Sequence, residues 1–373
     1  MQRPKTGAAI CMDCLAAAQR LMDLPLPEPP EAPGLRPPPR PLSLQEMLGV
    51  LEARVVGQEE AKEALAFAFL AHGERLKDPS LEVRPHLLLV GPTGSGKTHM
   101  VQVLAEATGL PTVHASATSF TQAGYVGDDL ETLLSRLLHE AGGDLELAES
   151  GVIFLDEIDK LARKTGPHRA EARDVGGEGV QQALLRLVEG ARVPVPANLA
   201  GPSRYASGER REVVMDTSRI LWIFAGAFEG LEAVVQERVA PPLGFTARRR
   251  SQAAVRPTHE DLIRYGMIPE LVGRIGQIAL LRPLSEEELY QILVGEGGFL
   301  AEYRALLGRF GVSLEADPAL LREVARRAAL LGLGARGLRA LLTPLLRRQA
   351  VQALREGRKE VRIALDAAME GLS

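Results

Sequence analysis

The chain has 373 residues, 46% of them apolar, which suggests roughly two or three domains with hydrophobic cores. Its net charge of −4 implies no general attraction to nucleic acid, and two cysteines are too few for a disulfide framework. The sequence shows no signal peptide and no apolar segment long enough to cross a bilayer. We therefore expect a soluble, cytoplasmic protein without a membrane or nucleic-acid partner.

The N-terminal residues 1–24 contain one C-x-x-C pair, formed by Cys11 and Cys14. A structural zinc ion needs four ligands, so this pair could bind zinc only with ligands from a second copy or another source. Two unremarkable thiols are the alternative. Residues 25–41 follow, and nine of these seventeen are proline, which predicts an extended linker at a domain boundary.

Helices are predicted between Leu42 and Leu81, with Ser43 at the position of an N-cap and a short turn at residues 55–58. The apolar pair Val55 and Val56 in this turn could cover one face of an adenine ring. A turn that packs into the core would show the same pattern.

The next segment fits the pattern G-x-x-x-x-G-K-[ST] in full. It follows an apolar run at 86–90 and precedes a predicted helix at 100–107, the context in which this pattern binds phosphate. Glycines let backbone N–H groups converge on phosphate oxygens, and the helix adds the positive end of its dipole. Lys97 would reach the β- and γ-phosphates of ATP, and Thr98 would bind Mg²⁺. The segment consists of Gly91, Pro92, Thr93, Gly94, Ser95, Gly96, Lys97 and Thr98.

Further apolar runs at 112–115, 152–155, 220–225 and 277–281 alternate with helical patterns. This alternation predicts an α/β fold with a parallel sheet covered on both faces. The run at 152–155 ends in Asp156 and Glu157, which a parallel sheet would bring to the same edge as the phosphate loop. Asp156 would contact Mg²⁺ through water, and Glu157 would polarise or orient the attacking water.

Two irregular segments carry apolar side chains. Tyr125 and Val126 stand between glycines, and Leu243, Gly244 and Phe245 precede a run of three arginines. Exposed apolar residues of this kind indicate contacts with another molecule. Folding back onto the core is the alternative for both. The polar stretches at 160–179 and 195–211 are typical of solvated surface loops.

From Ser285 onward the pattern is helical, opening on a capping box and including one predicted strand at 360–364. Arg274 and Arg336 both follow the predicted core, so they could supply positive charge to a γ-phosphate. One of them would act in its own subunit and the other in a neighbouring subunit, which would make catalysis depend on a ring. Either arginine could instead be a helix cap or a surface charge.

From about Leu42 to Leu354 the sequence resembles the ClpX family of AAA+ protein unfoldases. The resemblance implies a homohexamer that uses ATP and Mg²⁺ to unfold tagged proteins and to thread them through a central pore into the ClpP peptidase. It divides the chain into a remnant of a zinc-type domain at 1–24, a proline-rich linker at 25–41, a large AAA+ ATPase domain at 42–282 and a small, mostly helical AAA+ domain at 283–373.

The resemblance also assigns roles to motifs. Gly-Tyr-Val-Gly at 124–127 matches the first pore loop, where Tyr125 and Val126 would grip the substrate. Residues 173–182 match the second pore loop, with substrate contacts from Arg173, Asp174 and Val175. Leu243, Gly244 and Phe245 resemble the loop that docks on the peptidase. The remaining matches concern the nucleotide: Val55 and Val56 as adenine contacts, Asp156 and Glu157 as Walker B acids, Arg274 as the arginine finger, and Arg336 as the sensor-2 arginine that binds nucleotide.

Three features depart from the family pattern. Only one of two cysteine pairs is found, so either the start of the zinc domain is absent or the domain is degenerate. The Arg-Lys-His loop at the pore entrance is not found at 201–205, so the preference for tagged substrates can differ. The strand end at 225–227 lacks the asparagine common in AAA+ relatives, and no sensor-1 residue is assigned.

Two other functions are alternatives. A chaperone that remodels complexes without a peptidase would differ from the leading hypothesis only at the Leu-Gly-Phe loop. A nucleic-acid motor on the same core would need basic residues in the pore loop, where the sequence instead has Tyr125 and Val126 beside Asp128 and Asp129.

Overall fold

The computed structural model describes residues 39–120, 130–162, 175–196, 212–239, 256–295 and 297–363. Contacts divide the chain into residues 1–38 and 39–373, and every described residue belongs to the second unit. No helix in this described part combines the length and the hydropathy needed to cross a bilayer.

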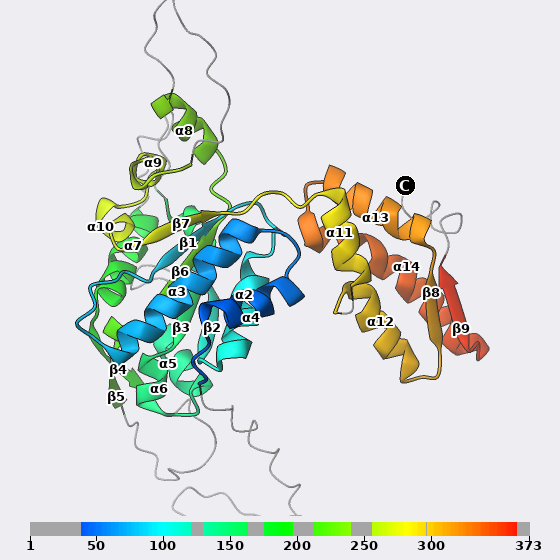
Figure 1. The fold of residues 1–373 in the computed structure, drawn as a ribbon, viewed down its shortest axis with the longest axis horizontal. Coiled ribbons are helices and arrows are strands. Elements are labelled where there is room, and N and C mark those ends of the chain that lie inside the picture. The colour runs from blue at the N-terminus through cyan, green and yellow to red at the C-terminus, as the bar shows by residue number, and fades with distance from the viewer. Residues whose placement is uncertain are drawn as a thin grey trace, which may run out of the picture. The chain divides into compact units, whose positions relative to one another are not determined.

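The centre of the fold is a five-stranded sheet with the order β2-β3-β6-β1-β7, in which every neighbouring pair is parallel (Figure 1). Strands β1, β3 and β6 are buried along nearly their whole length, as expected for a sheet that is covered on both faces. The predicted α/β fold is therefore confirmed. The strands are β1 (Leu87–Val90), β2 (Thr112–Ser116), β3 (Val152–Asp156), β6 (Leu221–Gly226) and β7 (Gln277–Leu280).

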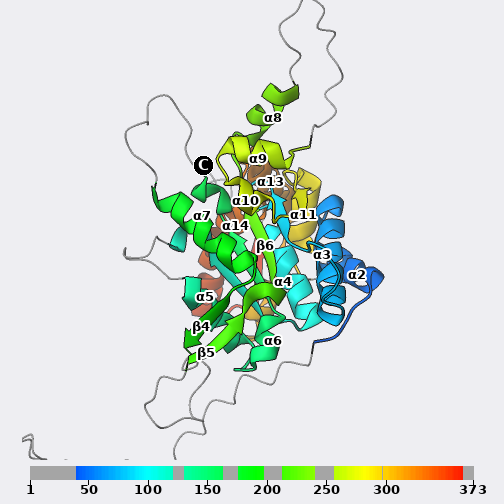
Figure 2. The same cartoon turned by 90° about the vertical axis from the view of Figure 1, so that its left-hand side faces the viewer.

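Alternate side chains of each central strand enter two different hydrophobic cores. Leu87 and Leu89 of β1 pack into one cluster, whereas Leu88 and Val90 pack into the other. Figure 2 shows α2 and α3 on one side of the sheet and α5 and α7 on the other. The first cluster is covered by α2 (Leu44–Arg54), α3 (Glu59–Lys77) and α4 (Lys97–Thr108).

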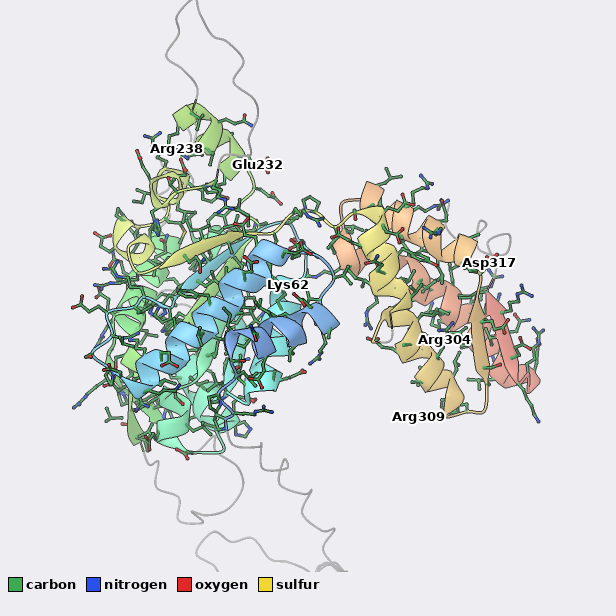
Figure 3. The ribbon with its side chains drawn as sticks, viewed as in Figure 1. Lys62, Glu232, Arg238, Arg304, Arg309 and Asp317 are labelled. Atoms are coloured by element: carbon green, nitrogen blue, oxygen red, sulfur yellow. The ribbon has the colours of Figure 1, made fainter. Side chains whose placement is uncertain are left out.

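The opposite face carries the remaining elements of this part. Arg238 of α8 donates to the buried carboxylate of Asp261 in α9 at 2.8 Å, which fixes α8 against α9 (Figure 3 labels Arg238). The elements are α5 (Leu130–Glu140), α6 (Leu145–Glu149), the short 3₁₀ turn η2 (Ile158–Leu161), α7 (Val175–Val188), α8 (Leu231–Val239), α9 (His259–Tyr265) and α10 (Pro269–Val272).

A hairpin on this face was not predicted. Strands β4 (Arg192–Pro196) and β5 (Glu212–Asp216) pair in antiparallel register. The polar pattern from Val195 onward predicts a solvated loop, but Val195 is fully buried within β4. Prolines at 194 and 196 conceal the strand, because proline is compatible only with edge strands and a two-stranded hairpin consists of edges.

The C-terminal part is helical and has a hydrophobic cluster of its own. As predicted, Ser285 and Glu288 form a capping box at its first helix. Two strands, β8 (Ser313–Ala316) and β9 (Glu360–Ile363), pair in parallel, although only β9 was predicted. The sequence Ser-Leu-Glu-Ala of β8 has no β-branched or aromatic residue that would indicate a strand. The helices are α11 (Glu286–Val294), α12 (Phe299–Gly308), α13 (Pro318–Leu330) and α14 (Gly334–Glu356).

Two histidines of the sheet region are buried in their neutral form. His72 Nε2 lies 2.9 Å from Ser150 O and must donate, because a carbonyl can only accept. His86 Nδ1 accepts from the backbone N–H of Trp222 at 3.3 Å, which requires an unprotonated nitrogen. Burial lowers the pKa of His72 to about 4 and that of His86 to about 3.

These histidines make stability depend on pH. The unfolded chain takes up a proton at each histidine below about pH 6.5, whereas the folded chain does not until far lower pH. The contribution of these two neutral histidines to the free energy of unfolding is therefore fully present above pH 6.5 and is lost as the pH falls toward 4. His72→Gln keeps a donor for Ser150 O without titrating. When the pH is lowered from about 7.5 to 4.5, the free energy of unfolding should fall in both proteins. The fall should be smaller in His72→Gln than in the wild type, by about 2 kcal/mol.

Denaturant unfolding at several pH values measures this difference. The control is His139→Gln at an exposed position of α5, which should follow the wild type. The same pH dependence for His72→Gln and the wild type would contradict the assignment of a neutral, buried His72.

Candidate functional site

The phosphate loop connects β1 to α4 with a conformation that needs its glycines. Gly94 and Gly96 have φ angles of 78° and 102°, in the left-handed region that side chains disfavour. The loop is anchored at both sides: Gly91 N donates to Gly226 O at 3.1 Å, and Ser95 Oγ donates to Pro92 O at 2.8 Å. The loop therefore presents its backbone at the N-terminus of α4, as the sequence predicted.

Lys97 lies in the first turn of α4 and is buried. Its Nζ donates to Gly91 O at 2.6 Å and to Pro92 O at 2.9 Å. Burial lowers the pKa of Lys97, and the carboxylates of Asp156 and Asp159 oppose that change. An ammonium group among loop carbonyls, beside a helix N-terminus, fits a site for phosphate oxygens.

Asp156 and Glu157 lie at the same edge of the sheet as this loop, because β3 and β1 run parallel on either side of β6. Asp156 ends β3, and its Oδ1 accepts from Glu157 N at 2.9 Å. Glu157 has a φ of 60°, which is unusual for a residue with a side chain and costs conformational energy. The half-buried Thr98 hydroxyl and the Asp156 carboxylate are oxygen donors of the kind that Mg²⁺ prefers.

Two hydroxyl groups that the sequence analysis missed hold Glu157. Its Oε2 accepts from Ser116 Oγ at 2.6 Å and from Thr118 Oγ1 at 3.1 Å. The hydrogen bond from Ser116 is the main reason why the pKa of Glu157 lies below its ordinary value. Ser116 ends β2 beside Asp156, so the rule that ligands bind at the carboxyl ends of parallel strands could have found it.

Asp159 is a second residue that the sequence analysis did not single out. It is 5% exposed, and neither carboxylate oxygen has a hydrogen-bond partner among the described residues. Lys160 Nζ lies 3.5 Å from Oδ2, which is an ion-pair contact too long for a good hydrogen bond. This buried carboxylate has little local compensation and lies within electrostatic reach of Lys97.

Arg336 reaches this site from the C-terminal part. It lies exposed in the first turn of α14, and its charge lowers the pKa of both Lys97 and Glu157. It makes no hydrogen bond or ion pair with another described residue. Next to it, Ala335 N donates to Gly94 O at 3.0 Å. The start of α14 therefore contacts the phosphate loop, with a guanidinium group in electrostatic reach of both catalytic candidates.

The turn before α3 contributes a residue that we did not predict. Val55 is 5% exposed and packs in the core with Leu51, whereas Val56 is half-buried. Gln58 is buried beside them: its Nε2 donates to Arg282 O at 2.8 Å and to Ser95 O at 3.3 Å, and its Oε1 accepts from Arg282 N at 3.1 Å. Gln58 thus joins the phosphate loop to the segment before α11.

Arg274 lies at the opposite edge of the sheet. β1 and β7 pair in parallel from Leu87 and Gln277 onward, so the residues before β7 are level with the start of β1. The phosphate loop follows the end of β1, roughly 13 Å further along at 3.3 Å per residue. The guanidinium of Arg274 instead pairs with Glu189: its Nε donates to Oε1 at 3.1 Å, and its Nη2 donates to the same oxygen. The structure therefore brings Lys97, Asp156, Glu157 and Arg336 together, but not Arg274.

Most of the other predicted site residues lie outside the described ranges. Val175 begins α7. In the described ranges, no group of three or more His, Cys, Asp and Glu side chains could hold a metal ion. Outside these ranges lie Cys11, Cys14, Tyr125, Val126, Arg173, Asp174, Leu243, Gly244 and Phe245.

The chain is similar to several known proteins. A family model described as an AAA domain of the Cdc48 subfamily matches residues 84–278. The chain is 43% identical over 325 residues to the ATP-dependent Clp protease ATP-binding subunit ClpX 3 of Methylococcus capsulatus. This match covers 80% of this chain and 73% of the relative. ClpX 2 of Wolinella succinogenes is 42% identical, with 81% and 75% covered, and ClpX of Treponema denticola is 38% identical, with 85% and 79% covered.

Gly96 gives a direct test of the phosphate loop. A β-carbon at Gly96 would meet no atom within 4 Å, so Gly96→Ala would suffer only from the φ of 102°. We expect a loss of roughly 1–2 kcal/mol in stability and a loss of at least about tenfold in affinity for a nucleoside triphosphate. Denaturant unfolding and titration with a fluorescent nucleotide measure the two effects.

The matched control is Gly49→Ala in the middle of α2, where a β-carbon also meets nothing within 4 Å. That change should stabilise the protein by about 0.5–1 kcal/mol and leave nucleotide affinity unchanged. Wild-type affinity in Gly96→Ala would show that the loop does not need its left-handed glycine.

Proposed function

The chain belongs to the ClpX family of AAA+ ATPases, and from that premise we propose that it is a ring-forming protein unfoldase that feeds a ClpP-type peptidase. The family makes it an ATPase of the Clp protease type. The homohexamer, the unfolding and threading of substrate proteins, and the transfer to a peptidase belong to the proposal. So does the division into a large ATPase domain at 42–282 and a small one at 283–373.

The observation that carries the proposal is the position of Arg274. An arginine level with the start of β1 cannot reach the nucleotide of its own subunit, which binds beyond the end of β1. The same arginine can act on a nucleotide that a neighbouring subunit holds, as arginine fingers do. Arg336 then serves the nucleotide of its own subunit and Arg274 that of the next one, so hydrolysis requires a closed ring of subunits.

The chain's own residues divide the work of hydrolysis. The Thr98 hydroxyl and, through water, the Asp156 carboxylate would hold Mg²⁺, which would neutralise charge on the phosphates. Lys97 and the loop N–H groups bind the β- and γ-phosphates of ATP. Glu157 accepts a proton of the attacking water or orients it, and Ser116 and Thr118 keep its carboxylate ionised and in place.

The substrate-handling residues follow from the family pattern. Tyr125 and Val126 would grip any polypeptide by apolar contact, which has no direction and suits a motor with varied substrates. Arg173, Asp174 and Val175 would form the second contact. Leu243, Gly244 and Phe245 would dock in the peptidase. Zinc at Cys11 and Cys14 would need further ligands from elsewhere.

Glu157→Gln tests the hydrolytic site. The amide keeps the shape of the side chain but cannot accept a proton, so ATP turnover should fall at least about 100-fold while ATP binding and ring assembly persist. A coupled phosphate-release assay measures turnover, and filter binding measures retained ATP. Glu106→Gln on the exposed face of α4 is the control and should turn over ATP normally. Normal turnover in Glu157→Gln would show that another group acts on the water.

Degradation of a stably folded, tagged protein tests the wider proposal. With ATP and a ClpP-type peptidase the wild type should degrade the protein, and without the peptidase it should unfold it. Phe245→Ala should abolish degradation but keep ATPase and unfolding activity, because the docking side chain is lost. Phe310→Ala removes an exposed phenylalanine elsewhere and serves as the control.

Three results would count against this proposal in different ways. Degradation retained in Phe245→Ala would exclude a docking role for that side chain. Unfolding without degradation by the wild type would favour a chaperone that works without a peptidase. ATPase stimulation by DNA that disappears at high salt would favour a nucleic-acid motor.

A further inference from the structure

A buried glutamine on α7 joins two segments of the catalytic machinery. Gln181 has no exposed surface, and both ends of its amide are bonded. Nε2 donates to Leu161 O at 2.7 Å, and Oε1 accepts from Ile268 N at 2.8 Å. A carbonyl can only accept and a backbone N–H can only donate, so the orientation of the amide is determined by its partners.

The two partners of this amide belong to segments that serve two different nucleotide sites in the proposed ring. Leu161 ends η2, the short turn that directly follows Asp156 and Glu157. Ile268 precedes α10, and Arg274 follows α10 after one glycine. Gln181 therefore links the acids that act on this chain's own nucleotide to the segment that carries a finger for another subunit's nucleotide.

Helix α7 makes contact with the same two segments at its two ends. Near its start, a β-carbon on Gly177 would lie 2.8 Å from Leu161 O, so the helix touches the turn after the Walker B acids. Immediately after its end, Glu189 pairs with Arg274. The helix has 14 residues and spans about 21 Å at 1.5 Å per residue. Because a helix is stiff, a shift of the turn at Leu161 moves both contacts with the finger segment.

We propose that Gln181 is a positioning residue for the arginine finger, which makes the position of Arg274 depend on the state of this chain's own Walker B segment. The inference rests on the proposed ring, in which Arg274 serves a neighbour. Glu189 gives the guanidinium of Arg274 a carboxylate partner when no γ-phosphate faces the guanidinium. A displacement of the turn at Leu161 is transmitted through Gln181 and α7 to the segment that carries Arg274. One subunit's nucleotide state thereby sets the rate of hydrolysis in the next.

Mixed rings separate this role from a structural one. Wild-type chains are mixed with an excess of a dopant that carries Glu157→Gln, which is inactive at its own site but offers an intact finger. A second dopant carries Glu157→Gln with Gln181→Met, a substitution of similar volume that lacks the amide. Because both dopants are inactive, any difference in turnover per wild-type subunit reports only on the finger that the dopant lends.

The Gln181→Met dopant should lower turnover per wild-type subunit about threefold or more relative to Glu157→Gln alone, a fraction of what a whole finger contributes. A dopant with Glu157→Gln and Arg274→Ala gives the full effect of a missing finger. The control dopant carries Glu157→Gln with Gln182→Met, the same change at the adjacent, exposed position of α7. It should match Glu157→Gln alone.

A further dopant, Glu157→Gln with Glu189→Gln, weakens the exposed carboxylate partner of Arg274 and should change turnover in either direction, because that partner helps to set where the guanidinium lies. It decides the question if Gln181→Met does not assemble into rings. The inference would be overturned if every dopant changed at Gln181 or Glu189 that assembles gives the same turnover as the dopant with Glu157→Gln alone. If the Arg274→Ala dopant has no effect either, the finger does not act in a neighbour, and it is the proposed function that fails.

Discussion

The parallel placement of β1 between β6 and β7 is the constraint on which the rest of the structure depends. Because the strands share one direction, the loop after β1 and the acids after β3 must meet at one edge of the sheet. For the same reason, the segment before β7 must lie at the other edge, where Arg274 pairs with Glu189. One chain thus holds most of the candidate phosphate site and, at a distance, a cation that lies out of reach of that site.

Three residues other than glycine adopt left-handed backbone conformations in the described part of the chain: Gln58, Glu157 and Phe228. Each lies beside the end of an element that borders the nucleotide site, and each is held by specific contacts. Gln58 bonds Arg282, Glu157 accepts from Ser116, and the ring of Phe228 packs against that of Tyr265, with centroids 5.2 Å apart. Strain of about 1–3 kcal/mol per residue persists only where surrounding contacts maintain it, and these contacts supply that support.

Local patterns were sufficient to single out most of the residues that the structure brings together in the candidate nucleotide site. The phosphate loop, the acids after β3 and the caps at Ser43 and Ser285 each depend on a few consecutive residues. Gln58 and Gln181 could not be predicted, because their partners Arg282 and Ile268 are distant in sequence and become neighbours only in the folded chain. A glutamine in a polar stretch looks the same whether it is solvated or buried with both ends bonded, and only the fold separates the two cases.

The contacts around the phosphate loop also connect it to the C-terminal helices in two ways. Ala335 at the start of α14 donates to Gly94 O, and Gln58 bonds both Ser95 O and the backbone of Arg282. A β-carbon on Gly57 would lie 2.2 Å from Glu288 Oε1 in the first turn of α11, so the turn before α3 lies directly against that helix. Arg282 also pairs with Glu288 and lowers its pKa to about 2, which keeps this carboxylate ionised at the start of α11. The loop therefore cannot shift relative to α11 and α14 without breaking these hydrogen bonds, so either the helices move with it or the bonds are exchanged.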